Sequence, residues 1–403
     1  MKIETFALER WMTTYEMDVR YDITESGIAP MSLREVIDLV PAGEREGLLA
    51  ELLGTRLGYS EAPGSLALRS ELAATYRATG PEEVLVTTGA IEANFLLFNV
   101  LLEAGDHVVV VHPSYQQLQS VPRAIGCDVS LWRLRAEDGF RFDLEELERL
   151  LRPGTKLIVI NTPHNPTGAV LSAAELRRVY VLAEERGAFV LCDEAYRWLN
   201  LPDGEPQAPP IRDLGPHGIS VGTFSKPFGL PGLRIGWIAG PAELVAACWA
   251  MRDYTSLSPG KLNDRLATVA LRHRDQVVER TRAIVAANLA TADAWIAEQA
   301  EVVTWQRPRG GLLAMLRYAF GLPSDELANR LAEAYGVMLA PGSAFGYEGY
   351  LRLGLGAPPE LFAAGLAETA RCFADLRASG TPLRAEERPL VGAATVGSPL
   401  GAT

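Results

Sequence analysis

The chain has 403 residues, of which 48% are hydrophobic and 22% are charged, and its net charge is -12. This composition is ordinary for a globular enzyme, and the length allows two domains or one large α/β unit. The acidic balance disfavours binding to nucleic acid. No run of about 18 apolar residues predicts a membrane span, and the N-terminus lacks the apolar core of a signal peptide. We therefore expect a cytoplasmic protein that binds neither nucleic acid nor membrane.

The cysteines and histidines form no recognisable metal or disulfide pattern. The four cysteines are widely spaced without a Cys-x-x-Cys pair, and the five histidines are scattered. We therefore predict no disulfide framework, no zinc site and no metal in the active site. The cysteines are Cys127, Cys192, Cys248 and Cys372.

The first two thirds of the chain predict an α/β fold. An N-terminal helix or arm is followed by an extended segment, residues 21–27, and by a helix in which apolar residues recur from Leu33 to Val40. Short apolar runs then alternate with helical patterns such as 171–186. Such runs suit strands buried on both faces, so we predict a mainly parallel sheet. The runs are Val84–Thr87, Val108–Val111, Leu157–Ile160, Phe189–Cys192, Ser220–Thr223 and Ile235–Ala239.

The C-terminal part predicts a smaller α+β unit. A helical pattern covers residues 264–299, and strand-like runs at 311–316 and 350–355 flank a helix near 326–334. Residues 379–403 are rich in Gly, Ala, Pro and Thr and have no apolar period, which predicts a disordered tail.

A lysine in a short loop rich in Gly and Pro, Lys226, carries the strongest chemical signal. Thr223 and Ser225 precede it, and Arg234 follows eight residues later. A lysine amine can form a Schiff base with a carbonyl cofactor, while hydroxyls and an arginine can hold the phosphate of such a cofactor. Taken alone, a lysine in such a loop is more often an ordinary solvated residue, so the interpretation depends on further motifs.

Two such motifs follow predicted strands, where ligands gather in α/β sheets. The loop 161–168 presents Asn165, a neutral amide donor, in a turn rich in proline. The next apolar run ends in Asp193, and Tyr196 follows three residues later. A buried carboxylate such as Asp193 needs a cationic partner.

Two more positions suit anionic groups. The turn Gly89-Ala90-Ile91 joins a strand to an amphipathic helix, where free N–H groups and the helix dipole attract an anion. Arg352 lies in a predicted strand, and its planar fork matches a carboxylate. An ordinary turn and a surface arginine are the alternatives.

Together and in this order, the motifs resemble the pyridoxal-phosphate (PLP) enzymes of the aminotransferase class I/II family. The resemblance implies the type I PLP fold, an α/β structure with a mixed, mainly parallel seven-stranded sheet in a large domain and a smaller α+β domain. It assigns residues 1–44 to the N-terminal arm and part of the small domain, 45–280 to the large PLP-binding domain and 281–378 to the small C-terminal domain.

The resemblance also implies roles for the site residues. Lys226 would form the Schiff base and move protons at the substrate Cα, and Asp193 would pair with the protonated pyridine nitrogen. Tyr196 and Asn165 would contact the phenolic oxygen of the cofactor, and Tyr115 would stack on its ring. The phosphate ligands would be Gly89, Ala90, Ile91, Thr223, Ser225 and Arg234.

Three further residues receive roles from the resemblance. Tyr59 would reach the cofactor phosphate of the partner subunit, which implies a homodimer with shared active sites. Arg352 would bind the α-carboxylate of an amino acid substrate, with Gly27 and Asn165 beside it.

The reaction type stays open in the sequence. We expect an aminotransferase, and the alternative is β/γ-elimination-replacement or cyclisation. The block Tyr21–Ile28, with the arm that contains Trp11, is similar to the capreomycidine synthase-like, arginine-cyclising enzymes of natural-product pathways. This similarity favours an arginine-derived or S-adenosylmethionine-type substrate for the alternative. Asp22 and Glu25 could pair with a cationic side chain or could be surface acids.

Two non-catalytic interpretations are weaker. A transcription regulator with an aminotransferase-like domain needs an N-terminal DNA-binding region, and only a short segment precedes the match. A catalytically dead scaffold conflicts with the presence of Lys226, Asp193, Asn165 and Arg234.

Overall fold

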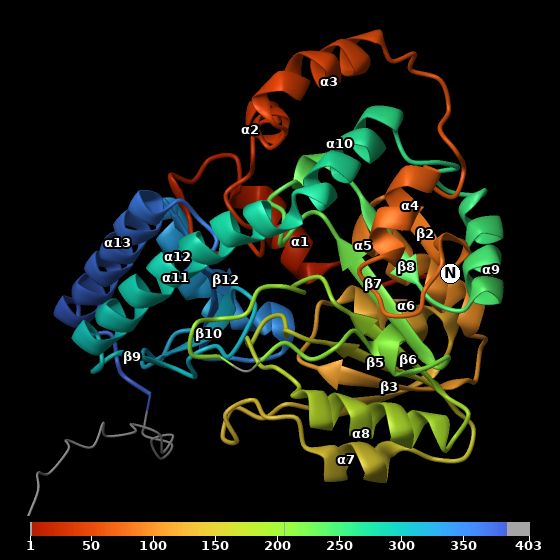
Figure 1. Ribbon diagram of the computed structural model, residues 1–403. Coiled ribbons are helices and arrows are strands. Elements are labelled where there is room, and N and C mark those ends of the chain that lie inside the picture. Colours follow the sequence, from red (N-terminus) through yellow and green to blue (C-terminus); the bar gives the residue numbers. More distant parts are fainter. Residues whose placement is uncertain (1, 205, 385–403) are drawn as a thin grey trace, which may run out of the picture.

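A mixed seven-stranded sheet forms the centre of the computed structural model, which describes residues 2–204 and 206–384 (Figure 1). The strand order is β2-β8-β7-β6-β5-β3-β4, and neighbours are parallel except where they involve β8. This is the mainly parallel sheet that the sequence predicts. The strands are β2 (Val84–Thr87), β3 (His107–His112), β4 (Asp128–Arg133), β5 (Thr155–Asn161), β6 (Phe189–Asp193), β7 (Gly218–Thr223) and β8 (Gly236–Ala239).

Helices cover both faces of this sheet because alternate strand residues point to opposite sides. Val108, Leu157 and their neighbours pack under α5, α6 and α9 on one face. Val109 and Ile158 pack against α7 and α8 on the other, along the bottom of Figure 1. The helices are α1 (Ala7–Tyr15), α2 (Leu33–Asp38), α3 (Ala42–Gly54), α4 (Leu66–Ala73), α5 (Gly89–Leu101), α6 (Gln117–Ile125), α7 (Leu144–Leu150), α8 (Ala173–Glu184), α9 (Ala242–Arg252), α10 (Lys261–Arg272), α11 (Arg274–Glu298), α12 (Ser324–Tyr335) and α13 (Pro359–Ala378).

A second, four-stranded antiparallel sheet has the order β12-β13-β10-β9 and packs with α11, α12 and α13 (Figure 1). Its strands are β9 (Val303–Trp305), β10 (Leu313–Tyr318), β12 (Ala340–Pro341) and β13 (Tyr350–Gly354). The N-terminal segment joins this part of the molecule, because β1 (Tyr21–Asp22) pairs in parallel with β11 (Val337–Met338). Both ends of the chain therefore contribute to the smaller sheet unit.

Several elements differ from the sequence-based expectations. The helix predicted over residues 264–299 is two helices, α10 and α11, which meet at His273. The edge strand β4 and the helix α13 were not predicted; β4 is mostly only partly buried, so it lacks the continuous apolar run that marks the central strands.

The start of the predicted tail also differs. Residues 379–384 continue the packing, because the backbone of Gly321 donates to the carbonyl of Pro382 and Phe320 bridges Leu383. The predicted tail residues 385–403 lie outside the described residues.

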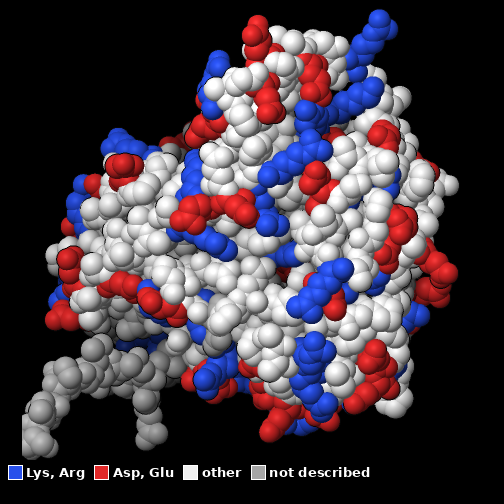
Figure 2. Space-filling model, viewed as in Figure 1, with Lys and Arg blue, Asp and Glu red and all other residues white. Residues whose placement is uncertain are grey.

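The surface carries acidic and basic side chains side by side on the face shown in Figure 2. Among the described residues, no helix is both long and apolar enough to cross a membrane.

Two glycines let the N-terminal segment lie directly on the end of β13. The amide of Gly354 donates to the carbonyl of Ile23 at 2.8 Å, and the amide of Ala29 donates to the carbonyl of Gly356 at 2.7 Å. A Cβ at Gly356 would lie 1.8 Å from the carbonyl oxygen of Gly27, so a side chain cannot be placed there without moving backbone.

Replacing Gly356 with Ala should therefore destabilise the fold. We expect the free energy of unfolding to fall by about 1–3 kcal/mol, as for other substitutions that overpack a close contact. Urea unfolding of the purified chain measures this. The matched control is Gly43→Ala on α3, where a Cβ meets nothing within 4 Å and where alanine favours the helix. A loss in Gly356→Ala no larger than that in the control would contradict the packing argument.

Candidate active site

A cavity of about 420 Å³ opens where β5, β6 and β7 end at their carboxyl edge. Its walls come from the large sheet, the smaller sheet unit and α1. The cavity is lined by all but two of the residues that the sequence assigns to the cofactor or substrate: Gly89, Ala90, Ile91, Tyr115, Asn165, Asp193, Tyr196, Thr223, Ser225, Lys226, Arg234 and Arg352.

Lys226 lies three residues beyond β7, and its amine faces the N-terminal segment. The Nζ atom donates to Ser26 Oγ at 2.7 Å and lies 3.5 Å from Glu25 Oε1. The cavity leaves half of the Glu25 side chain exposed. Burial would raise the pKa of Glu25, but the positive charges of Lys226 and Arg352 outweigh it and lower the pKa below its usual value. Glu25 is therefore a charged member of the site.

Asp193 ends β6 as a buried carboxylate at the cavity wall. It accepts hydrogen bonds from Asn94 Nδ2 at 2.9 Å and from the amide of Ala195 at 3.0 Å. Burial nevertheless raises the pKa of Asp193, because these two donors and the more distant Lys226 do not replace water fully. A cation bound beside Asp193 would lower its pKa again and favour the carboxylate form.

The loop after β5 holds Asn165 through a neighbouring asparagine. Asn161 Oδ1 accepts from the amide of Asn165 at 2.6 Å, and Asn161 Nδ2 donates to the carbonyl of Asp193 at 2.7 Å. His164 is buried beneath this loop, with Nδ1 2.8 Å from Thr167 Oγ1. Burial lowers the pKa of His164 to about 3, so the imidazole is neutral at ordinary pH. The loop is thus anchored to both β5 and β6.

Two tyrosines face the cavity as neutral phenols. The Tyr115 hydroxyl donates to Glu9 Oε1 at 2.8 Å, and Tyr196 hydrogen-bonds Ser26. Burial raises the pKa of both tyrosines, and the charge of Glu9 raises that of Tyr115 further. Each phenol can therefore donate or accept one hydrogen bond without ionising at neutral pH.

The start of α5 forms a cradle for an anion. Gly89 has a φ of 77°, and a Cβ there would lie 2.9 Å from Arg234 Nη2. A Cβ at Gly236 would lie 2.5 Å from the amide nitrogen of Ala90. These glycines keep the cradle open between the helix N-terminus and the guanidinium. The hydroxyls of Thr223 and Ser225, 3.1 Å apart, complete its rim.

Arg352 enters the cavity from β13 and is only 1% exposed. Its Nη2 donates to the carbonyl of Thr24 at 2.9 Å, and its Nη1 lies 3.4 Å from Asn165 Oδ1. Burial lowers the pKa of Arg352, and its Nε has no hydrogen-bond partner within the described part of the chain. A buried guanidinium with an unused donor suits an anionic ligand such as a carboxylate.

The helix α1 roofs the cavity and is tied to both halves of the molecule. Its N-terminal end bonds the large sheet unit, where the amide of Ala7 donates to Gln116 Oε1 at 2.8 Å. Its other side bonds the smaller unit, where Trp11 Nε1 donates to Asn329 Oδ1 at 2.8 Å. The residues of α1 and its C-terminal end that line the cavity are Leu8, Glu9, Met12 and Glu16.

The sequence interpretation missed part of the site. It did not identify Ser26, Asn94, Asn161 or the α1 residues; of these, only Asn161 carried a local signal, as the polar end of a buried strand. Asp22 does not line the cavity, and its Oδ1 accepts the backbone amides of Thr24 and Glu25.

Two predicted site residues do not line the cavity. Gly27 is buried just behind it, where its carbonyl packs on Gly356. Tyr59 is 82% exposed on the surface and has no place in the cavity of its own chain.

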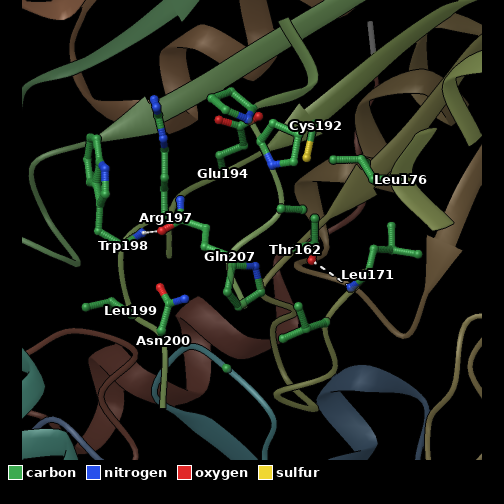
Figure 3. Close-up of a pocket in the computed structure, with 16 residues that line it drawn as sticks. Thr162, Leu171, Leu176, Cys192, Glu194, Arg197, Trp198, Leu199, Asn200 and Gln207 are labelled. Atoms are coloured by element: carbon green, nitrogen blue, oxygen red, sulfur yellow. Dashed lines mark hydrogen bonds between the residues drawn. The ribbon is translucent and has the colours of Figure 1, made fainter. Parts of the chain in front are cut away.

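A second, smaller pocket lies on the opposite side of β6 (Figure 3). Cys192 and Glu194 line it, whereas Asp193 between them faces the larger cavity, as strand alternation requires. Its volume is about 30 Å³, room for about one water molecule. The arrangement of Lys226, Asp193 and the anion cradle therefore makes the larger cavity the candidate active site.

Comparison with known proteins agrees with this geometry. The family described as aminotransferase class I and II matches residues 30–364. The chain is 35% identical to a capreomycidine synthase of Streptomyces vinaceus, covering 88% of this chain and 90% of that one. It is 30% identical to an arginine–pyruvate transaminase of Pseudomonas aeruginosa, covering 83% of this chain and 87% of the relative.

Solved structures show the same fold. A PLP-dependent aminotransferase from Streptococcus suis superposes with a TM-score of 0.88 and 36% identity, over 93% of this chain and 99% of that one. The PLP-dependent cyclase OrfR gives a TM-score of 0.84 and 35% identity, over 93% of this chain and 98% of that one.

The buried histidine under the Asn165 loop predicts a pH dependence of stability. Unfolded His164 titrates near 6.5 and folded His164 near 3. Between these values only the unfolded chain binds the proton, so stability falls as the pH drops below about 6.5, by roughly 2 kcal/mol at pH 5. His164→Gln should remove this contribution and so reduce the slope of stability against pH in urea unfolding measured between pH 7 and 5. His112→Gln should act in the same direction, because burial lowers the pKa of His112 to about 4. An unchanged slope in His164→Gln would refute the buried, neutral state of this histidine.

Proposed function

The chain belongs to the family of class I and II aminotransferases, enzymes that use pyridoxal phosphate, and we propose that Lys226 binds this cofactor covalently in the cavity. The residues that line the cavity fit pyridoxal phosphate. The cradle at Gly89 and Arg234 suits its phosphate, and buried Asp193 suits its protonated ring nitrogen. When bound, the cofactor withdraws electrons from the Cα of the attached amino acid, so that a bond to that carbon can break.

The remaining residues orient the cofactor and the substrate. Tyr196 and Asn165 would bind the phenolic oxygen, and Tyr115 would cover the ring. Arg352 would bind the α-carboxylate, because the Nε donor of its buried guanidinium has no hydrogen-bond partner among the described residues. Lys226, released by the substrate, would take the proton from Cα.

The cavity favours an amino acid with a cationic side chain. Glu9 and Glu16 bring carboxylates to the cavity from the α1 side. This acidic wall is the observation that carries the substrate proposal, since a guanidinium or ammonium group would pair with it. The sulfonium of S-adenosylmethionine meets the same charge requirement.

Two reactions remain candidates on this site. Transamination is the reaction named for the family and for the arginine–pyruvate transaminase. Elimination followed by cyclisation is favoured by the capreomycidine synthase and the cyclase OrfR, each 35% identical to the chain. The α1 roof supports the second candidate, because an unsaturated intermediate must be kept from water until the second nucleophile reacts.

Holoenzyme incubated in deuterated water with arginine, and with arginine carrying a leaving group at Cβ, separates the two reactions. We expect loss of the leaving group without release of a keto acid. Pyridoxamine phosphate and a keto acid, with no reaction at Cβ, would instead establish transamination. Mass spectrometry follows both products, and Lys226→Ala should lose the visible absorbance of bound cofactor and about a thousandfold of activity.

The acidic wall is tested in the same assay. Glu16→Gln should raise KM for arginine about tenfold, as for loss of a charge-assisted contact, but should leave KM for a neutral amino acid of similar length unchanged. An equal change for both substrates would rule out charge recognition by Glu16.

We also propose a homodimer with shared active sites. Tyr59 is exposed, and two leucines shortly before it in the chain are exposed as well, Leu53 at 80% and Leu57 at 79%. Such a surface suits burial against a second copy. Tyr59 would then donate to the cofactor phosphate of the partner subunit.

Sedimentation of the holoenzyme should show a dimer. Tyr59→Phe should leave the sedimentation unchanged but weaken cofactor binding about tenfold or more, since a hydrogen bond to a charged group is worth about 1.5–3 kcal/mol. A fully active monomer would exclude the shared site.

We place the enzyme in the cytoplasm. Its four cysteines are free thiols, three of them buried, which suits a reducing compartment.

A further inference from the structure

The free amine of Lys226 has hydrogen-bond and ion-pair partners of its own in the cavity. This amine contacts two consecutive residues of the N-terminal segment, with Ser26 Oγ at 2.7 Å and Glu25 Oε1 at 3.5 Å. Neither residue belongs to the strands and loops that carry the predicted cofactor ligands. The pair therefore contacts the amine from a part of the chain that carries no predicted cofactor ligand.

Ser26 extends the contact to a phenol. Its hydroxyl accepts from Lys226 and also hydrogen-bonds Tyr196, so the amine and the phenol are joined through one side chain. A hydroxyl with one acceptor site filled by Lys226 keeps its own proton for Tyr196. The Ser26 orientation is therefore fixed from both sides.

The segment that carries the pair is held in place by the fold. The carboxylate of Asp22 accepts the amides of Thr24 at 2.9 Å and Glu25 at 3.0 Å. Thr24 Oγ1 accepts the amide of Ala340 at 2.8 Å, and a Cβ at Gly354 would lie 2.2 Å from the carbonyl of Glu25. Ser26 and Glu25 are thus preorganised and do not have to be ordered when the amine arrives.

We propose that Glu25 and Ser26 are positioning residues that hold the free amine of Lys226 in its protonated form between the proton transfers of the reaction. This rests on the proposed function, in which the substrate frees Lys226. The proton taken from Cα stays on Nζ, paired with the Glu25 carboxylate and oriented by Ser26. It leaves Nζ when the next acceptor, such as a departing group at Cβ, takes it, so that no further acid is required.

Competitive acetylation of the full-length cofactor-free chain tests the contacts of Lys226 with Glu25 and Ser26 without catalysis. Trace acetic anhydride labels Lys226 and the exposed Lys156, and mass spectrometry gives their ratio. Glu25→Gln should raise labelling of Lys226 relative to Lys156 roughly two- to fivefold, the worth of a partly exposed ion pair. Ser26→Ala should raise it to a similar extent, and Ser26→Thr should restore the wild-type ratio. The matched control is Glu16→Gln, a cavity acid for which no contact with Lys226 is seen, and it should leave the ratio unchanged.

Kinetics of the holoenzyme separate this role from substrate binding. For Glu25→Gln, a positioning role predicts a lower kcat with little change in KM. An unchanged labelling ratio in both Glu25→Gln and Ser26→Ala would overturn the proposal. A higher KM with unchanged kcat would also overturn it, because Glu25 would then be a ligand of the substrate side chain. The labelling needs no cofactor, so the two failures can be told apart: a wild-type chain that fails to bind pyridoxal phosphate would refute the proposed function, whereas an unchanged labelling ratio would refute the contact of Glu25 and Ser26 with the amine.

Discussion

Parallel pairing of β5, β6 and β7 is the constraint on which the site depends. Asn161 stands opposite Asp193 in the ladder, and Thr223 ends the next strand at the same edge. Parallel strands have their carboxyl ends on one side, so three polar residues far apart in sequence meet there. The antiparallel strand β8 then brings Gly236 back against the start of α5. The positions of the anion cradle and of the buried Asp193 carboxylate therefore both follow from the strand register of the large sheet.

The sequence predicted most of this central layer for a physical reason. Strands buried on both faces must be apolar throughout, so all six predicted runs coincide closely with strands, and Asp193 and Thr223 mark the ends of two of them. The residues with unusual chemistry follow directly: Lys226 and Asn165 lie in loops whose glycines and prolines are visible without a structure. Their assembly in one cavity was thus foreseeable, although their roles rest on family likeness.

What the sequence did not predict depends on contacts between distant segments. Ser26 lies in an extended segment with no local signal. It reaches Lys226 only because β1 pairs with β11, more than 300 residues later in the chain. Asn94 is one polar residue in an apolar helix until α5 packs on β6 and its amide reaches Asp193. Glu9 reaches the Tyr115 hydroxyl only because α1 lies over the cavity. No local pattern marks these residues because their partners are supplied by tertiary structure.

The double attachment of α1 makes the roof a mechanical link as well as a wall. Its bonds to Gln116 anchor it to the large sheet unit and its bond to Asn329 anchors it to the smaller one. A rotation that separates the two units must break one set, and the helix then travels with the other. Such a rotation would cost at least the weaker of the two sets of bonds. Any opening of this kind would be governed by a few hydrogen bonds that are remote from the atoms that react.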